Sequence, residues 1–261
     1  MPAYLCIDIG NTQICIALIR GEEVLSEYHI PSAAPRSPEE YAAGIRGVLR
    51  PLPPEHRDIR GAVISSVVPR LTRPLQDAVH TVLKKDALIV DHRLPLSLTI
   101  RYEDPSEVGA DRICNAAAAL KRYPAPLIIV DMGTATTFDV ISEHREYLGG
   151  VIMPGLETAG RDLFRRAARL PEVNFDFPAK VIGTRSRESL QAGLMWGTID
   201  QIDGMIQRIC KEWHKAQVTV VATGGLSEVI APRSRYIQHV DRSLTLFGMK
   251  YIFEELSGER T

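Results

Sequence analysis

The sequence lacks an excess of charge of either sign, since its 261 residues include 31 Lys and Arg against 32 Asp and Glu. Non-specific nucleic-acid binding needs a strong positive field, which this balance does not supply. A local basic cluster is interpreted as a solvated helix face. It consists of Arg161, Arg165, Arg166 and Arg169. The sequence therefore predicts no nucleic-acid partner.

Cysteines are few, and no two have the C-x-x-C spacing of zinc sites or thioredoxin-like motifs. Cys6 and Cys114 lie in apolar stretches, as buried free thiols usually do, and the other two are Cys15 and Cys210. This usage favours a reducing compartment. No apolar run approaches the roughly 20 residues of a membrane helix, and no basic segment precedes an apolar one at the N-terminus. We expect a cytoplasmic protein with no signal peptide and no membrane partner.

Several common nucleotide-binding and catalytic motifs are also absent. The sequence has no G-x-x-x-x-G-K-[ST] and no G-x-G-x-x-G after its first predicted strand, which disfavours a P-loop and a Rossmann site. H-E-x-x-H, G-x-S-x-G and the protein-kinase signatures are missing too.

What the sequence does contain is an internal repeat, which is a primary signal of architecture. Residues 5–19 (LCIDIGNTQICIALI) and 128–142 (IIVDMGTATTFDVIS) both have an apolar run, then Asp-x-Gly, then a second β-rich run. Asp8 aligns with Asp131, and Gly10 aligns with Gly133. Each copy is predicted to be a β-hairpin with a polar, glycine-containing tip.

A second pair of segments supports the duplication. Residues 62–79 and 218–231 both read as a strand, a turn of small residues and a helix. Strands that alternate with helices predict an α/β fold with mixed sheets flanked by helices. Pro124 and Pro126 follow a predicted helix at 110–122 and mark a boundary, so we expect two similar domains, 1–122 and 123–261.

Two such hairpin tips facing each other across a cleft would make a phosphate site. Backbone N–H groups in glycine turns form anion-binding concavities. The carboxylates of Asp8 and Asp131 would repel phosphate unless a cation intervenes, which indicates a metal-assisted polyphosphate site. The alternative is that each Asp only caps its own turn.

The segment from Gly109 to Asn115 opens an alanine-rich helix and carries Asp111 in its first turn. A first-turn acid can simply stabilise the helix start. The alternative is catalytic: Asp111 is a general base, and Arg112 beside it binds a substrate carboxylate. That pair suits an acidic substrate that bears a hydroxyl group.

Two glycine-rich segments leave a similar choice open. Gly149 to Gly155 is either a loop that approaches a nucleotide closely or merely a turn. Gly224-Gly225 is either a nucleotide contact or a helix-entry turn.

Seven segments, in order along nearly the whole chain, resemble the type III pantothenate kinases of the acetate and sugar kinase, Hsp70 and actin superfamily. GADR, DMGTATTFDV and GGVIMPG are highly specific together, whereas DIGNT alone is weak. The segments are DIGNT (8–12), ISSVVP (64–69), GADRICNA (109–116), DMGTATTFDV (131–140), YLGGVIMPG (147–155), LFRRAARLPEV (163–173) and ATGGL (222–226).

The resemblance implies duplicated actin-like (ribonuclease H-like) domains with a cleft between them. It implies ATP-dependent phosphorylation of pantothenate to 4′-phosphopantothenate, the first step of coenzyme A biosynthesis. It also implies a homodimer, magnesium, and a monovalent cation, K⁺ or NH₄⁺.

The resemblance also assigns roles to single residues. Asp111 would be the catalytic base, Asp131 would bind the monovalent cation and Asp8 would bind magnesium. The remaining assignments fall into two groups. ATP would contact Asp8, Ile9, Gly10, Asn11, Thr12, Gln13, Ile14, Cys15 and Thr134, and pantothenate would contact Tyr102, Gly109, Ala110, Asp111, Arg112 and Ser186.

Two departures from the family pattern stand out. The family's I-G-x-N-T stretch, whose Thr reaches pantothenate from the neighbouring subunit, has Arg185 and Ser186 here at the Asn and Thr positions. Ser186 keeps the hydroxyl, and Thr184 is the alternative donor if the register slips by two. Phe247 replaces the Glu of a family L-T-L-E-G stretch.

Two other interpretations of function remain. One is a catalytically idle regulatory or accessory protein on the same scaffold, since fold does not guarantee function. The other is a different small-acid kinase or a phosphatase of the superfamily. The presence of Asp8 and Asp111 argues against the first, and GADR with Asp131 argues against the second.

Overall fold

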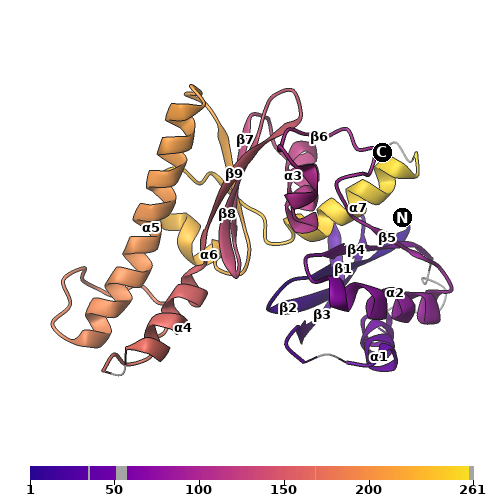
Figure 1. The fold of residues 1–261 in the computed structure, drawn as a ribbon, viewed down its shortest axis with the longest axis horizontal. Coiled ribbons are helices and arrows are strands. Elements are labelled where there is room, and N and C mark those ends of the chain that lie inside the picture. The colour runs from indigo at the N-terminus through magenta and orange to yellow at the C-terminus, as the bar shows by residue number, and fades with distance from the viewer. Residues whose placement is uncertain (35, 51–57, 168, 259–261) are drawn as a thin grey trace. The chain divides into compact units, whose positions relative to one another are not determined.

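The computed structural model describes residues 1–34, 36–50, 58–167 and 169–258 (Figure 1). The chain forms two compact units. Unit 1 comprises Met1–Arg122, Arg145–Tyr147 and Ser243–Thr261, and unit 2 comprises Tyr123–His144 and Leu148–Arg242. No helix of the described ranges combines the length and the apolarity that crossing a membrane requires.

The sheet of unit 1 has the strand order β3-β2-β1-β4-β5. β1 pairs antiparallel with β2 and parallel with β4, so the sheet is mixed. Every residue of β1 except Asp8 is buried, because helices cover both faces of this central strand. The strands are β1 (Ala3–Ile9), β2 (Gln13–Arg20), β3 (Glu23–Pro31), β4 (Ile59–Ser66) and β5 (Ala87–Ile89).

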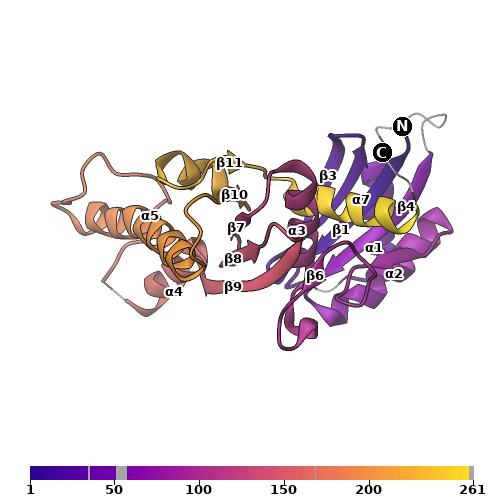
Figure 2. The ribbon, with the colours of Figure 1, turned by 90° about the horizontal axis from the view of Figure 1, so that it is seen from above.

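Two pairs of helices cover the two faces of this sheet (Figures 1 and 2). α1 (Pro38–Leu49) and α2 (Pro69–Leu83) pack on the face that carries Leu5, Ile7 and Ile9. α3 (Ala110–Arg122) and α7 (Leu244–Leu256) pack together on the other face, where Tyr4 meets Phe253 edge-to-face at 5.6 Å. A short 3₁₀ turn (Pro105–Glu107) leads into α3.

The second sheet has the order β11-β10-β7-β8-β9-β6. Its last strand, β6 (Thr99–Ile100), pairs with Glu146 and Tyr147 at the start of β9, and all four residues belong to unit 1. The other strands are β7 (Leu127–Met132), β8 (Ala135–Ile141), β9 (Glu146–Pro154), β10 (Thr219–Thr223) and β11 (His239–Val240).

The core of unit 2 forms where the long helix α5 (Ser186–Glu212) packs on this sheet. Met195, Ile199, Ile202 and Ile206 recur every three or four positions, which places them on one helix face, in a core cluster with buried residues of β7, β8 and β10. The remaining helices are α4 (Leu156–Arg166), α6 (Ser227–Ile230) and a 3₁₀ turn (Ala231–Arg233).

The structure confirms the predicted duplication. β1 and β2 form one hairpin, β7 and β8 form the other, and each first strand also pairs in parallel with a strand that leads into a helix. β4 and α2 are that strand and helix in unit 1, and β10 and α6 are their counterparts in unit 2. The helix predicted at 110–122 is α3 with the same bounds.

Other expectations have mixed outcomes. The solvated helix face is confirmed for Arg161, Arg165 and Arg166, which are exposed and pair with acids of α4; one such pair is Arg161 with Glu157 at 2.9 Å. Arg169 is also exposed but lies beyond the end of the helix. The prediction of a loop or turn from Gly149 to Gly155 is wrong for residues 149–154, because they lie inside β9, and Gly155 alone follows the strand. Residue 168, within the resembling stretch 163–173, lies outside the described residues.

The two-domain division stays a prediction. Its boundary after residue 122 falls where unit 1 gives way to unit 2. The last helix, which the sequence assigned to the second domain, instead packs in unit 1. The reason is its apolar face and Gly248, where an added Cβ would lie 2.0 Å from the Cys114 carbonyl oxygen of α3.

Candidate active site

The first hairpin tip is a tight turn held by one hydrogen bond within the turn and by two hydrogen bonds from Ser32, which follows β3. The Gly10 N–H donates to the Gln13 carbonyl at 3.0 Å, and the buried Ser32 hydroxyl donates to the Gly10 carbonyl at 2.6 Å. The Ser32 N–H also donates to the Thr12 carbonyl at 2.9 Å. The side chains of Asn11, Thr12 and Gln13 are exposed, so the tip presents polar groups to a ligand.

Asp8 and Asp111 belong to neighbouring elements at one end of the unit 1 sheet. Asp8 pairs with Ser65 of β4, and the chain that follows β4 stays beside β1, because the Val67 N–H donates to the Ile9 carbonyl at 3.1 Å. A Cβ built on Gly109, at the start of α3, would lie 3.4 Å from the Val67 side chain. The β4 end thus links the end of β1 to the first turn of α3.

The carboxylates of Asp8 and Asp111 both affect the pKa of the buried Cys114 thiol. Its pKa is raised well above the usual value, first by burial and then by the negative charges of Asp8 and Asp111. Charges act over such a thiol only when they lie close to it. The structure therefore brings together, within unit 1, the two acids that the sequence singled out in separate motifs.

Asp111 is partly buried and held in a defined orientation. Its Oδ1 accepts a hydrogen bond from the Arg112 N–H at 2.8 Å. A Cβ at Gly109 would lie 2.5 Å from that same oxygen, so glycine is what allows this carboxylate position. Burial raises the pKa of Asp111, and this effect outweighs the lowering by the Arg112 N–H and by the Arg112 charge.

Arg112 is buried beside the aromatic ring of Tyr147, which in turn contacts the ring of Tyr102. Its guanidinium carbon lies 5.7 Å from the centre of the Tyr147 ring, and the Tyr102 ring lies 6.1 Å from that of Tyr147. Cation–π contact of this kind fixes the direction of an arginine. The sequence predicted Arg112 and Tyr102 but gave Tyr147 no role, and its only signal was its position at the head of the YLGGVIMPG stretch.

The second hairpin tip, in unit 2, is built against two other glycine turns. The Thr134 carbonyl accepts hydrogen bonds from the Gly155 N–H at 3.1 Å and from the Thr158 hydroxyl at 2.7 Å. A Cβ on Gly155 would lie 2.3 Å from the Gly133 carbonyl oxygen. Of the glycine-rich segment after β8, Gly155 is thus the residue that makes the close backbone approach.

Asp131 lies beneath the turn that follows β10. It pairs with Thr223 across the two parallel strands, and a Cβ on Gly224 would lie 2.7 Å from an Asp131 carboxylate oxygen. Gly224 has a φ of +88° and its carbonyl accepts from the Ser227 hydroxyl at 2.7 Å. Gly224 therefore opens a helix-entry turn and also packs closely on Asp131.

Ser186, predicted to contact pantothenate, is the first residue of α5 in unit 2 and is exposed. It lines an open hollow of about 440 Å³ with Arg185, Thr184 and Gly183. The Thr184 hydroxyl and N–H both point to the Glu188 carboxylate, at 3.3 and 3.0 Å. Ser186 is thus the better placed of the two hydroxyl candidates for an external ligand.

Comparison with known proteins decides the family. A sequence profile for type III pantothenate kinase matches residues 4–208. The chain belongs to the type III pantothenate kinase family. Among its relatives, the type III pantothenate kinase of Finegoldia magna is 41% identical over 250 residues, which is 95% of each chain. That of Moorella thermoacetica is 40% identical over 250 residues, 96% of this chain and 98% of the relative.

Solved structures of other proteins share the fold of this member of the type III pantothenate kinase family. The activator of the 2-hydroxyisocaproyl-CoA dehydratase from Clostridium difficile has a TM-score of 0.55 at 13% identity, covering 99% of this chain and 98% of that one. The ROK hexokinase from Thermus thermophilus has a TM-score of 0.53 at 11% identity, covering 98% and 99%. The predicted α/β fold of the actin-like type, with mixed sheets flanked by helices, is confirmed.

Proposed function

We propose that this chain transfers the terminal phosphoryl group of ATP to the hydroxyl group of pantothenate, forming 4′-phosphopantothenate in the first step of coenzyme A biosynthesis. The observation that carries the proposal is that the end of β4 links the two acids. Asp8 pairs with Ser65 of β4, and Val67 after β4 contacts both the end of β1 and the Gly109 position before α3. It supports a phosphate-side acid and an acceptor-side acid at one site. The family membership supplies the substrate.

Asp111 is proposed as the residue that accepts the proton of the pantothenate hydroxyl. Phosphoryl transfer depends mainly on positioning and on charge neutralisation, so Asp111 also orients the hydroxyl for in-line attack. Arg112, fixed by Tyr147, binds the pantothenate carboxylate. Tyr102, Gly109 and Ala110 complete this side of the site.

The first hairpin, from Asp8 through Cys15, is proposed to hold the ATP phosphates, with Thr134 contacting ATP from the second hairpin. Asp8 and the neighbouring Ser65 hydroxyl offer the oxygen ligands that Mg²⁺ prefers, so these residues fit a magnesium ion. When bound, magnesium neutralises charge on the phosphates. Asp131 is proposed to bind K⁺ or NH₄⁺, because its carboxylate lies among the turns at Gly133 and Gly224.

We also propose a homodimer, in which Ser186 reaches the pantothenate of the neighbouring subunit. The exposed hollow around Ser186 supports this role, because its hydroxyl is accessible at the start of a rigid helix. The cytoplasmic location stays a prediction from the sequence.

The function is tested by measuring ATP consumption with pantothenate, with and without K⁺ or NH₄⁺. We expect turnover that requires both pantothenate and the monovalent cation, with 4′-phosphopantothenate as the product. ATP consumption that ignores pantothenate would indicate another substrate, and a screen of small hydroxy acids would follow. A folded protein that binds ATP but consumes none would favour the idle accessory protein.

The proposed base predicts how activity depends on pH. Because burial raises the pKa of Asp111, kcat/KM should fall with decreasing pH at values above the ordinary aspartate range near pH 4. The free energy of unfolding changes with pH in the opposite direction. Protonated Asp111 stabilises the fold, and this contribution is lost as pH rises through the raised pKa. A pH–rate profile whose acid limb lies at or below the ordinary aspartate range would contradict the assignment.

Gly224→Ala tests the proposed cation and ATP side. The new Cβ would lie 2.7 Å from the Asp131 carboxylate and from the Met132 backbone, at a φ that suits glycine. We expect a weaker activation by K⁺ and roughly a 10-fold or greater loss of kcat/KM, since small displacements in a site are costly. Gly225→Ala is the matched control, because its Cβ meets nothing within 4 Å. Equal activity of the two variants would refute a role for this turn.

A further inference from the structure

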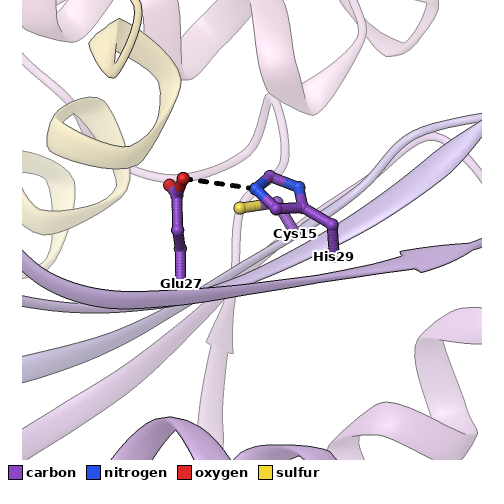
Figure 3. A group of neighbouring side chains, drawn as sticks. All are labelled: Cys15, Glu27 and His29. Carbon is purple, nitrogen blue, oxygen red and sulfur yellow. Dashed lines mark ion pairs between the residues drawn. The ribbon is translucent and has the colours of Figure 1, made fainter.

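Among the described residues, three metal-ligating side chains gather on one face of the unit 1 sheet (Figure 3). Cys15 lies on β2, and Glu27 and His29 lie on β3. One ligand atom of each, the Cys15 sulfur among them, lies within 4.8 Å of the other two. None of these side chains except Cys15 belongs to the proposed kinase site.

The strand register explains this grouping. Cys15 is directly opposite His29, and Ala17 is opposite Glu27, in the antiparallel pair β2–β3. Residues two apart on a strand share a face, so Glu27 and His29 both point to the side on which Cys15 lies. The backbone of two paired strands thus holds the three ligand positions.

The spacing and chemistry match a tetrahedral, thiophilic cation. The His29 Nε2 lies 3.4 Å from the Glu27 Oε1. Bonds of roughly 2.0–2.3 Å from zinc to nitrogen, oxygen or sulfur place two tetrahedral ligands about 3.3–3.6 Å apart. The imidazole and the carboxylate therefore already have the separation of two zinc ligands. A small movement of the Cys15 side chain would bring its sulfur into place as the third ligand.

The cluster is also accessible. The side chains of His29 and Glu27 are 43% and 53% exposed, and Cys15 is partly buried beneath them. An ion can enter from solvent, and water can fill the fourth position. Without a metal the thiol stays protonated, because burial and the charges of Asp8 and Glu27 raise its pKa to about 12. A bound cation therefore displaces a proton from the thiol.

We propose that Cys15, Glu27 and His29 bind a thiophilic divalent cation, for which Zn²⁺ is the best match. β1 lies along the other edge of β2 from β3, and its residue Asp8 pairs directly with Cys15. A cation at this site consequently lies beside the carboxylate proposed to hold magnesium. The cation lowers kinase turnover because its positive charge attracts the Asp8 carboxylate that is proposed to hold magnesium. This consequence rests on the proposed function, whereas the metal site does not.

The metal site is tested by titrating the full chain with Co²⁺, a spectroscopic substitute for Zn²⁺, and then displacing Co²⁺ with Zn²⁺. We expect one equivalent to bind with a thiolate-to-cobalt charge-transfer band. Cys15→Ser should abolish the band, and His29→Gln and Glu27→Gln should weaken binding by roughly 10- to 100-fold. Circular dichroism checks that each variant is folded, which we expect for the exposed β3 positions Glu27 and His29 and for the near-isosteric change at Cys15 on β2.

Two substitutions serve as matched controls. Cys210→Ser removes a partly exposed thiol in unit 2, and His80→Gln removes an exposed histidine that pairs with Asp86 at 3.0 Å. Both should bind Co²⁺ as the unmodified chain does. A band that is absent from the unmodified chain, or that survives Cys15→Ser and His29→Gln, overturns the site.

The kinase consequence has its own test. Zn²⁺ should inhibit turnover of the unmodified chain, and a chelator should reverse the inhibition. His29→Gln should keep the basal kcat and need roughly 10-fold more Zn²⁺ for the same inhibition. Equal sensitivity in His29→Gln overturns the coupling to Asp8. Co²⁺ binding without any kinase activity would instead contradict the proposed function and leave the metal site standing.

Discussion

Asp111→Asn should lower kcat by roughly 10²-fold or more, because the amide cannot accept the proton of the substrate hydroxyl. Its Oδ1 can still accept the hydrogen bond from the Arg112 N–H, so the local geometry is retained. ATP binding should therefore be close to that of the unmodified chain. Steady-state kinetics and ATP titration measure the two effects separately.

Stability separates a catalytic loss from a folding loss in this variant. Because the ionised Asp111 is disfavoured by burial, the neutral amide should raise the free energy of unfolding at neutral pH. Glu107→Gln, in the exposed 3₁₀ turn that precedes α3, is the control and should keep full activity. Near-normal turnover by Asp111→Asn, or a loss of activity that follows a loss of folded protein, would refute the role of Asp111.

Gly248→Ala should be the most destabilising single-methyl change in unit 1 that we propose. The added Cβ would lie 2.0 Å from the Cys114 carbonyl oxygen, and the contact is with backbone, which cannot rotate away. The helices must separate, and forced overpacking of this kind costs roughly 1–3 kcal/mol. Urea denaturation should show a correspondingly lower midpoint.

The same change should also reduce activity at temperatures where the protein stays folded. α3 carries Asp111 and Arg112 in its first turn, and α7 supports it along the Gly248 contact and through the Thr245 hydroxyl, which lies 2.7 Å from the Asn115 side-chain oxygen. Gly47→Ala in α1 is the control, because its Cβ meets nothing within 4 Å and alanine favours the helix. If both variants unfold at the same denaturant concentration, the argument that α3 packs closely on α7 at Gly248 is refuted.

The sequence predicted those features whose cause is local. Both hairpins followed from apolar runs interrupted by Asp-x-Gly, and α3 followed from its alanines, so these elements appear where they were expected. Periodicity and turn chemistry act between neighbours in the chain. The repeat extended this information to the topology, because both copies have the same strand pairings.

Features that depend on distant residues were harder to predict. Phe247 appeared only as a missing acid, whereas in the structure it is buried with the Arg122 guanidinium 3.9 Å from its ring centre. Tyr147 had no assigned role because its partner Arg112 is 35 positions earlier in the chain. Gly149 and Gly150 suggested a loop, but pairing within β9 overrides their weak strand preference.

The sequence by itself determined the family, the repeated hairpins and the identity of the acids that carry the proposed chemistry, because these are written in contiguous motifs. Only the tertiary structure decided that the last helix packs in unit 1, that Gly109 and Gly224 lie against the carboxylates of Asp111 and Asp131, and that Cys15 meets His29 and Glu27. The physical reason is that strand register and close backbone packing join residues far apart in the chain. No local pattern encodes those distances.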